Sequence, residues 1–145
     1  MSRMPSMGDK WDARLLELAR HVSGWSKDPS TKVGAVIVRP DRTIASVGYN
    51  GAPRGVIDDN LDDRAYKLAI TVHSEVNAIL SAHEQLDGCT LYVWPMPPCS
   101  HCAGAVIQAG IARVVAPAPG ERWAQSCRIG RGMMRQAGIE QEWIE

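Results

Sequence analysis

Two short segments constrain this chain more than any other feature: HSEVNAI at residues 73–79 and PPCSHC at residues 97–102. They supply one histidine, His73, and two cysteines, Cys99 and Cys102, which are side chains that zinc prefers as ligands. A catalytic zinc typically has three protein ligands and keeps its fourth position for water. Two thiolates also cancel the formal charge of the dication. The sequence therefore predicts one catalytic zinc site, with Glu75 beside it as the proton carrier.

The spacing within each segment agrees with this prediction. Pro98 is well suited to the position just before a helix, which places Cys99 and Cys102 on one face of its first turn. Amides at a helix N-terminus favour the thiolate, which is the form that binds metal. His73 and Glu75 are two residues apart and diverge inside a helix, so they converge only where the chain enters one. An extended-looking run that ends near residues 71–72 predicts such an entry.

Two other uses of the same residues stay open at this point. The Cys99–Cys102 pair has the spacing of a thioredoxin-like redox motif, but that hypothesis leaves the His-x-Glu segment unexplained. A closed structural zinc site would need a fourth ligand, for which His101, Cys89 and Cys127 are the candidates. We expect His101 to point away from the metal, because it lies between the two cysteines on a helical turn.

Length and composition indicate an ordinary globular chain. Its 145 residues predict a single domain, residues 1–145, in which residues 1–8 are flexible. Lys and Arg balance Asp and Glu, 16 against 16, so no long nucleic acid partner is expected. No apolar run approaches the roughly 20 residues that span a bilayer, and the first residues lack a signal-peptide core, so we expect no membrane partner and a cytoplasmic location. In that reducing compartment Cys89 and Cys127 are expected to be buried free thiols.

Hydrophobic periodicity predicts helices and strands in alternation. Asp9 caps a first helix that continues to about Trp25, and further helices follow His73, Pro98 and Cys127. Strands are expected at residues 33–39, 43–50, 90–94, 113–116 and 139–144. This order predicts an α/β fold, a three-layer α/β/α sandwich around a central mixed sheet of about five strands. The loop at residues 50–64 carries four aspartates, for which a solvated face, helix caps and a magnesium site are the alternatives.

His-x-Glu followed by Pro-Cys-x-x-Cys is the pattern of zinc nucleobase deaminases. With these motifs, and with SKDPSTKVGAVIV at residues 26–38 and GYNGAPRG at residues 48–55, the chain resembles the zinc-dependent cytidine/deoxycytidylate deaminase superfamily. Within it the dCMP deaminases are most similar. The resemblance covers nearly the whole chain from about residue 10.

The resemblance implies roles for further residues. Asn50 corresponds to the residue that binds the sugar and the base edge, although an Asn turn before Gly51 explains it equally well. Ser74 replaces the usual alanine, at the position whose backbone amide binds the base. Arg54 is the candidate phosphate clamp, because a guanidinium binds phosphate through two donors. Two more substrate contacts are expected at Pro98 and at Trp94, which either stacks on the base or packs in the core.

One segment departs from the family pattern. Four residues, 94–97, connect the third strand to Pro98, where the family usually has three. Because this segment borders the base pocket, the extra residue and the tryptophan are expected to alter which substrate fits.

These observations together predict zinc-dependent hydrolysis of a cytosine nucleotide, dCMP to dUMP with release of ammonia. Zinc supplies an activated water and Glu75 carries the protons. The alternatives are the same chemistry on cytidine, a free base or another amino-heterocycle, and a non-catalytic zinc-binding module. The resemblance also implies a homo-oligomer, from dimer to hexamer, and a regulatory nucleotide with Mg²⁺.

Overall fold

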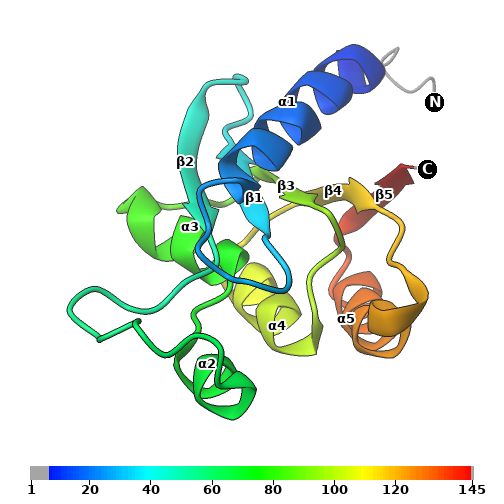
Figure 1. The fold of residues 1–145 in the computed structure, drawn as a ribbon. Coiled ribbons are helices and arrows are strands. Elements are labelled where there is room, and N and C mark those ends of the chain that lie inside the picture. Colours follow the sequence, from blue (N-terminus) through cyan, green and yellow to red (C-terminus); the bar gives the residue numbers. More distant parts are fainter. Residues whose placement is uncertain (1–6, 145) are drawn as a thin grey trace.

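The computed structural model describes residues 7–144, which form five strands and five α-helices with one short 3-10 helix (Figure 1). The strands are β1 (Gly34–Val38), β2 (Ile44–Tyr49), β3 (Thr90–Trp94), β4 (Arg113–Pro117) and β5 (Glu140–Ile144). The helices are α1 (Met7–Ser23), α2 (Arg64–Ile70), α3 (Ser74–Ala82), α4 (Ser100–Gln108), η1 (Glu121–Trp123) and α5 (Ala124–Gln136).

The strands form one mixed sheet in the order β2-β1-β3-β4-β5. β1 pairs with β2 and β3 in the antiparallel sense, whereas the β3–β4 and β4–β5 pairs are parallel. The two parallel connections run through α4 and α5. The predicted mixed sheet of five strands is confirmed, and every predicted strand lies within about one residue of its observed bounds.

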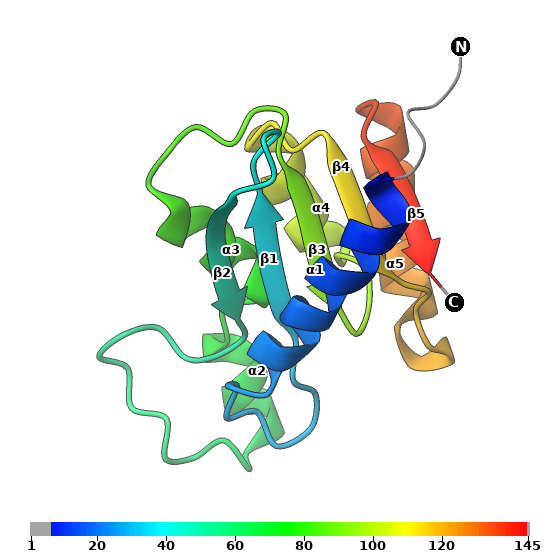
Figure 2. The same ribbon diagram turned by 90° about the horizontal axis from the view of Figure 1, so that it is seen from above.

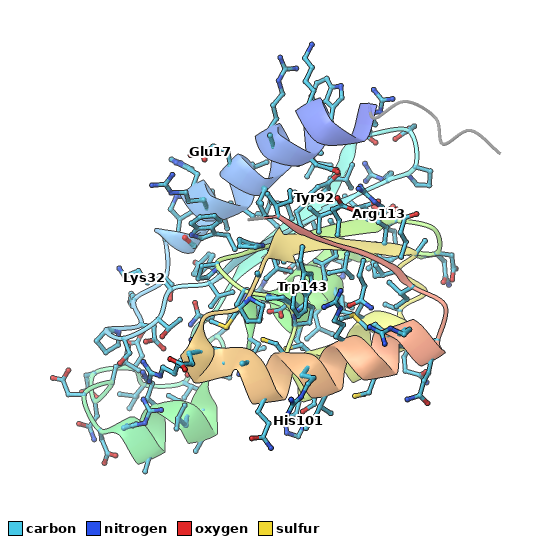
Figure 3. The ribbon with its side chains drawn as sticks, turned by 90° about the vertical axis from the view of Figure 1, so that its right-hand side faces the viewer. Glu17, Lys32, Tyr92, His101, Arg113 and Trp143 are labelled. Atoms are coloured by element: carbon cyan, nitrogen blue, oxygen red, sulfur yellow. The ribbon has the colours of Figure 1, made fainter. Side chains whose placement is uncertain are left out.

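Helices cover both faces of this sheet. α1 crosses one face, and α3, α4 and α5 lie on the other (Figures 1 and 2). In the side view, Tyr92 and Arg113 lie on the α1 side and Trp143 lies between the sheet and α5 (Figure 3). The predicted three-layer α/β/α architecture is therefore confirmed.

Apolar side chains fill the space on both faces of the sheet. β3 shows the division, because Leu91 and Val93 pack toward α3 and α4, whereas Tyr92 and Trp94 pack toward α1. Alternation of side chains along a strand produces this separation. The metal ligands lie on the Leu91 side, so the direction of each β3 side chain decides whether it can reach them.

The structure differs from the sequence prediction at two helices. α1 begins at Met7, before the expected cap Asp9, while residues 1–6, to which most of the expected flexible segment belongs, lie outside the described residues. The extended run expected to end near residues 71–72 is present but short, with extended backbone at Thr71 and His73, and the unpredicted helix α2 occupies Arg64–Ile70 directly before it. Asp63 begins this helix by accepting a hydrogen bond from the Tyr66 amide at 3.1 Å. Among the described residues, none of the helices combines the length and apolar character needed to cross a membrane.

Candidate metal centre

The N-termini of α3 and α4 bring the three predicted metal ligands together. His73 is the N-cap of α3, with extended backbone (φ −70°, ψ 154°), and Cys99 is the N-cap of α4 (φ −73°, ψ 176°). Cys102 lies in the first turn of α4 and is buried. The chain therefore enters a helix at His73, as the two-residue spacing to Glu75 required.

Two glycines permit the close packing that fixes these helix starts. A Cβ atom at Gly48 of β2 would lie 2.5 Å from the Ser74 carbonyl oxygen and from the Ala78 amide nitrogen of α3. A Cβ atom at Gly130 of α5 would lie 2.7 Å from the carbonyl oxygen of Pro98. Only glycine allows backbones to approach this closely. β2 thus supports the His73 end of the site, and α5 supports the Cys99 end.

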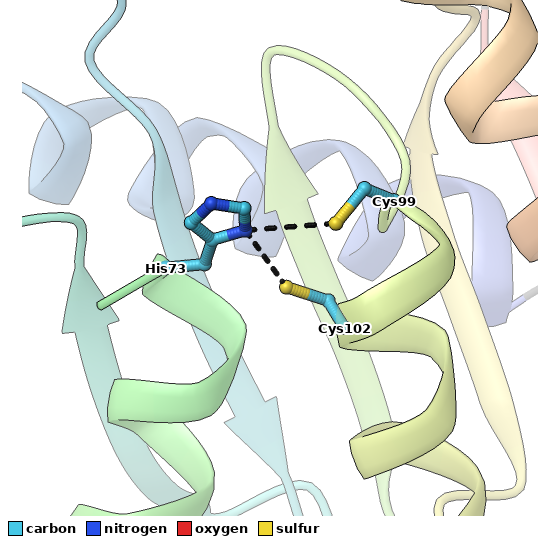
Figure 4. A group of neighbouring side chains, drawn as sticks. All are labelled: His73, Cys99 and Cys102. Carbon is cyan, nitrogen blue, oxygen red and sulfur yellow. Dashed lines mark hydrogen bonds between the residues drawn. The ribbon is translucent and has the colours of Figure 1, made fainter. Parts of the chain in front are cut away.

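The three ligand atoms fit a zinc ion. His73 Nδ1 lies 3.1 Å from Cys102 Sγ and 3.6 Å from Cys99 Sγ, and all three atoms lie within 4.8 Å of one another (Figure 4). In a tetrahedral site with ordinary Zn–N and Zn–S bonds, the nitrogen and sulfur atoms are about 3.6 Å apart and two sulfur atoms about 3.8 Å. Distances and donor types therefore both suit Zn²⁺.

The candidates for a fourth protein ligand lie elsewhere. Within the described residues, the group of potential ligands contains His73, Cys99 and Cys102 alone. His101 is exposed on α4, as expected from its place between the cysteines. Cys89 and Cys127 are buried free thiols, and the Cys127 thiol donates to the Pro97 carbonyl oxygen at 3.4 Å. The arrangement is that of a three-ligand catalytic site rather than a closed structural one.

The two thiols of the cluster have unequal proton affinities. A hydrogen bond from Cys102 lowers the pKa of Cys99 to about 3, and a hydrogen bond with His73 contributes in the same direction. The same hydrogen bond to Cys99 raises the pKa of Cys102, and burial raises it further. The hydrogen bond with Cys99 in turn raises the pKa of His73. Cys99 is thus held as the thiolate, the form that binds metal.

Glu75 lies beside the cluster in the first turn of α3. Its side chain is 4% exposed, and burial raises the pKa of its carboxyl group above the ordinary value. The Ser74 hydroxyl donates to Glu75 Oε1 at 2.8 Å and fixes the carboxylate. A buried carboxyl group with a raised pKa, held in one orientation, suits transfer of protons at neutral pH.

A cavity of about 140 Å³ opens onto these residues. His73, Ser74, Glu75 and Cys99 line it on one side, together with Pro97. The other lining residues come from five segments: the loop before β1, the end of β2, α2, the β3–α4 connection and η1. They include Ser30, Thr31, Asn50, Arg64, Lys67, Met96, Arg122 and Trp123. The cavity thus places a small molecule against both the metal ligands and Glu75.

Asn50 is buried in the wall of this cavity. Its side-chain amide donates to the Thr31 carbonyl oxygen at 2.9 Å, and its carbonyl oxygen accepts from the Val33 amide at 2.9 Å. The Asn50 side chain therefore lines the cavity and also fixes the backbone of residues 31–33, which lead into β1.

Three predicted substrate contacts lie outside the cavity lining. Trp94 packs toward α1 on the opposite face of the sheet, with the Arg20 guanidinium 5.5 Å from its ring centre, so the core-packing alternative is the one observed. Arg54 lines a separate, neighbouring cavity formed by the loop at residues 50–58. Pro98 is fully buried behind Cys99 and contributes through its position in the chain.

Sequence reasoning missed several residues that line the cavity. Arg64 and Lys67 belong to α2, which periodicity did not reveal, and Lys67 forms a buried ion pair with Asp28 at 3.0 Å. Arg122 and Trp123 belong to η1, in a segment that reads as a Pro/Gly loop. Trp123, rather than Trp94, is therefore the tryptophan that lines this cavity. The turn-forming composition of both segments gave no signal for these contacts.

Fold and site together define a class: an α/β protein with a three-ligand His/Cys/Cys metal centre and a buried glutamate, the arrangement of a zinc-dependent hydrolytic deaminase. Residues 9–118 match the family model for the cytidine and deoxycytidylate deaminase zinc-binding region. The chain belongs to this family.

Relatives and solved structures agree with this membership. The chain is 44% identical over 143 residues to a deaminase of Aliivibrio fischeri, covering 95% of this chain and 96% of the relative. It is 33% identical over 138 residues to the deoxycytidylate deaminase of Mus musculus, covering 90% and 77%. In structure it is similar to the dCMP deaminase of cyanophage S-TIM5, with a TM-score of 0.77 and 25% identity over 95% of this chain and all of that one.

Proposed function

We propose that this protein hydrolyses the amino group of deoxycytidine monophosphate, giving dUMP and ammonia. The main support for this proposal is one cavity that could hold a small molecule. Residues of the three-ligand cluster and the buried Glu75 both line it. The names of its relatives, which include deoxycytidylate deaminases from mouse and human, support dCMP as the substrate.

The side chains of the cavity account for the steps of this reaction. When bound by His73, Cys99 and Cys102, zinc supplies a water acidified to near neutral pH. Glu75 accepts a proton and delivers it to the ring nitrogen beside the amino carbon, which makes that carbon electrophilic. The oxygen of this water forms a bond to the electrophilic carbon. Glu75 then moves the remaining proton of that oxygen to the amine, and the carbon–nitrogen bond breaks. One water is consumed, ammonia leaves, and the oxygen stays on the ring as a carbonyl.

Several residues position this chemistry. Ser74 orients the Glu75 carboxylate, and its backbone amide is our candidate contact for the base. Asn50, which lines the cavity, is our candidate contact for the sugar or base edge. Pro98 holds the start of α4. The predicted contacts of Arg54 and Trp94 with substrate receive no support from the cavity lining.

Other features of the proposal rest on the sequence. A homo-oligomer, a cytoplasmic location, one domain over residues 1–145 and regulation by a nucleotide with Mg²⁺ stay predictions. Of the four loop aspartates, Asp58 pairs with Lys27 at 3.2 Å and Asp63 caps α2. Those two therefore have structural partners of their own.

An ammonia-release assay tests the proposed function. Zinc-loaded protein would be given dCMP, CMP, deoxycytidine, cytidine and cytosine, with the Glu75→Gln variant as the blank. We expect turnover of dCMP well above that of the other four. Preferred turnover of cytidine or cytosine would show that the substrate is a nucleoside or a free base and not dCMP. No turnover by protein with full zinc content would favour a non-catalytic zinc-binding module.

A further inference from the structure

The charged side chains of the metal cavity are divided between its floor and its rim. Glu75, at the floor beside the ligands, is 4% exposed. Arg64 from α2 and Arg122 from η1 line the same cavity and are exposed to solvent. The two arginines come from segments almost 60 residues apart, so the fold brings them to one opening.

The remaining charged pair of the cavity is already neutralised. Lys67 Nζ lies 3.0 Å from Asp28 Oδ1, and their side chains are only 5% and 9% exposed. Asp28 also accepts from the amides of Ser30 and Thr31 at 2.8 and 3.0 Å. Lys67 is thus committed to Asp28, which organises the cavity wall.

The two arginines, by contrast, have no acidic partner within residues 7–144: none of the ion pairs found there involves Arg64 or Arg122. The Arg122 guanidinium lies 4.8 Å from the ring centre of Trp123, so an aromatic surface supports it. The rim therefore presents two guanidinium groups above a floor that holds the reacting groups.

We infer that Arg64 and Arg122 bind the 5′-phosphate of a nucleoside monophosphate whose base lies against Glu75 and the metal ligands; this inference rests on the proposed function. Guanidinium groups match phosphate oxygens through paired N–H donors, and two of them balance the charge of a phosphate monoester. A nucleoside or free base would leave both arginines without a partner. Arg64 and Arg122 are thus the residues that distinguish nucleotide from nucleoside, in place of Arg54.

Two measurements test the inference. The first is calorimetric binding of dUMP and of deoxyuridine, which needs no turnover. The second is KM and kcat for dCMP and deoxycytidine. Arg64→Gln and Arg122→Gln should each weaken dUMP binding and raise KM for dCMP about tenfold, since a hydrogen bond to a charged group contributes about 1.5–3 kcal/mol and every 1.4 kcal/mol is about tenfold. Deoxyuridine binding and kcat for dCMP should change little.

Matched variants separate the possible outcomes. Arg128→Gln removes an exposed arginine from α5 outside the cavity and should leave both measurements unchanged. The inference is overturned if Arg64→Gln and Arg122→Gln weaken dUMP and deoxyuridine equally, or if Arg54→Gln alone lowers affinity for dUMP. Selective dUMP binding through Arg64 and Arg122 without turnover of dCMP would uphold the inference and overturn the proposed function.

Discussion

Glu75 combines burial, a fixed orientation and a place next to the metal ligands. Burial favours the neutral acid, whereas the hydrogen bond from Ser74 favours the carboxylate, and burial is the larger effect on its pKa. A group balanced in this way can both accept and release a proton during one reaction cycle. The neighbouring ligands His73 and Cys99 have a separate role, because their lone pairs bind the metal.

The Glu75→Gln variant separates proton transfer from metal binding. Gln keeps the size of the side chain and can still accept from Ser74, but it does not carry a proton. We expect zinc content to stay at one per chain and kcat for dCMP to fall by about 10²- to 10⁴-fold. Zinc analysis and steady-state kinetics measure the two effects. Substantial activity in the zinc-loaded variant would show that another group transfers the proton.

Asp28 gives the cavity wall a pH dependence of its own. Burial alone would raise the pKa of its carboxyl group, but hydrogen bonds from the amides of Thr31 and Ser30 and from Lys67 outweigh that effect and lower it. A carboxylate whose pKa is lower in the folded than in the unfolded state stabilises the fold above its unfolded pKa, about 3.9. That stability is lost as the pH falls through the folded pKa.

Substitution of Asp28 by Asn should therefore have its largest effect near neutral pH. Removing one member of a buried ion pair costs about 3 kcal/mol of unfolding free energy, because Lys67 is left unpaired. We expect the difference between wild type and Asp28→Asn to shrink below about pH 4. Denaturant unfolding at pH 7 and at low pH measures this difference. Asp59→Asn, in the exposed loop, is the control, and a pH-independent difference for Asp28→Asn would contradict the assignment.

At the scale of elements, the site depends on where two helices begin. β2 and α5 set these positions through the close approaches at Gly48 and Gly130. The Cys127 thiol adds a hydrogen bond to Pro97, just before the start of α4. α5 therefore contributes to the metal centre without supplying a ligand.

Gly130→Ala tests this role of α5, and Gly132→Ala in the same helix is its matched control. A methyl group at Gly130 would contact the backbone of Pro98 and Cys99, whereas one at Gly132 would meet nothing within 4 Å. Overpacking costs about 1–3 kcal/mol, so we expect Gly130→Ala to lower stability and retain less zinc after dialysis. Gly132→Ala should raise stability by about 0.5–1 kcal/mol, since alanine is the better helix former. Equal zinc retention in both variants would show that α5 does not position Cys99.

The elements also show why sequence reasoning succeeded in some places and failed in others. The ligand segments were predictable because zinc chemistry and helix geometry restrict them to few arrangements. The position of Trp94 was not predictable. Both faces of β3 are apolar, so the alternation of its side chains alone does not show which face lies toward the metal site. α2 was missed because it is a seven-residue helix within a turn-rich segment, and Lys67 and Arg64 were missed with it.

At the scale of the whole molecule, the two faces of the sheet have different roles. On the α1 face, Asp12 accepts hydrogen bonds from Tyr92 at 2.7 Å and from Arg113 at 2.8 and 2.6 Å, which fasten α1 to β3 and β4. On the other face, the metal cluster connects the start of α3 to the start of α4. In the chain, α3 follows β2 and α2, and α4 follows β3. A bound metal therefore links two segments that are 26 residues apart at their nearest ligands, His73 and Cys99.

Removal of zinc should consequently destabilise the whole fold and not only stop the reaction. A ligand present at about 1,000 times its Kd stabilises the folded state by about 4 kcal/mol. For a chain of this size that corresponds to a change in Tm of about 10 °C. We expect a chelator to lower the Tm of the wild-type protein by that amount and the Tm of His73→Ala, which lacks one ligand, by much less. Thermal unfolding followed by circular dichroism measures both shifts in Tm. Equal shifts in the two proteins would mean that the stabilising metal is bound outside the His73, Cys99 and Cys102 cluster.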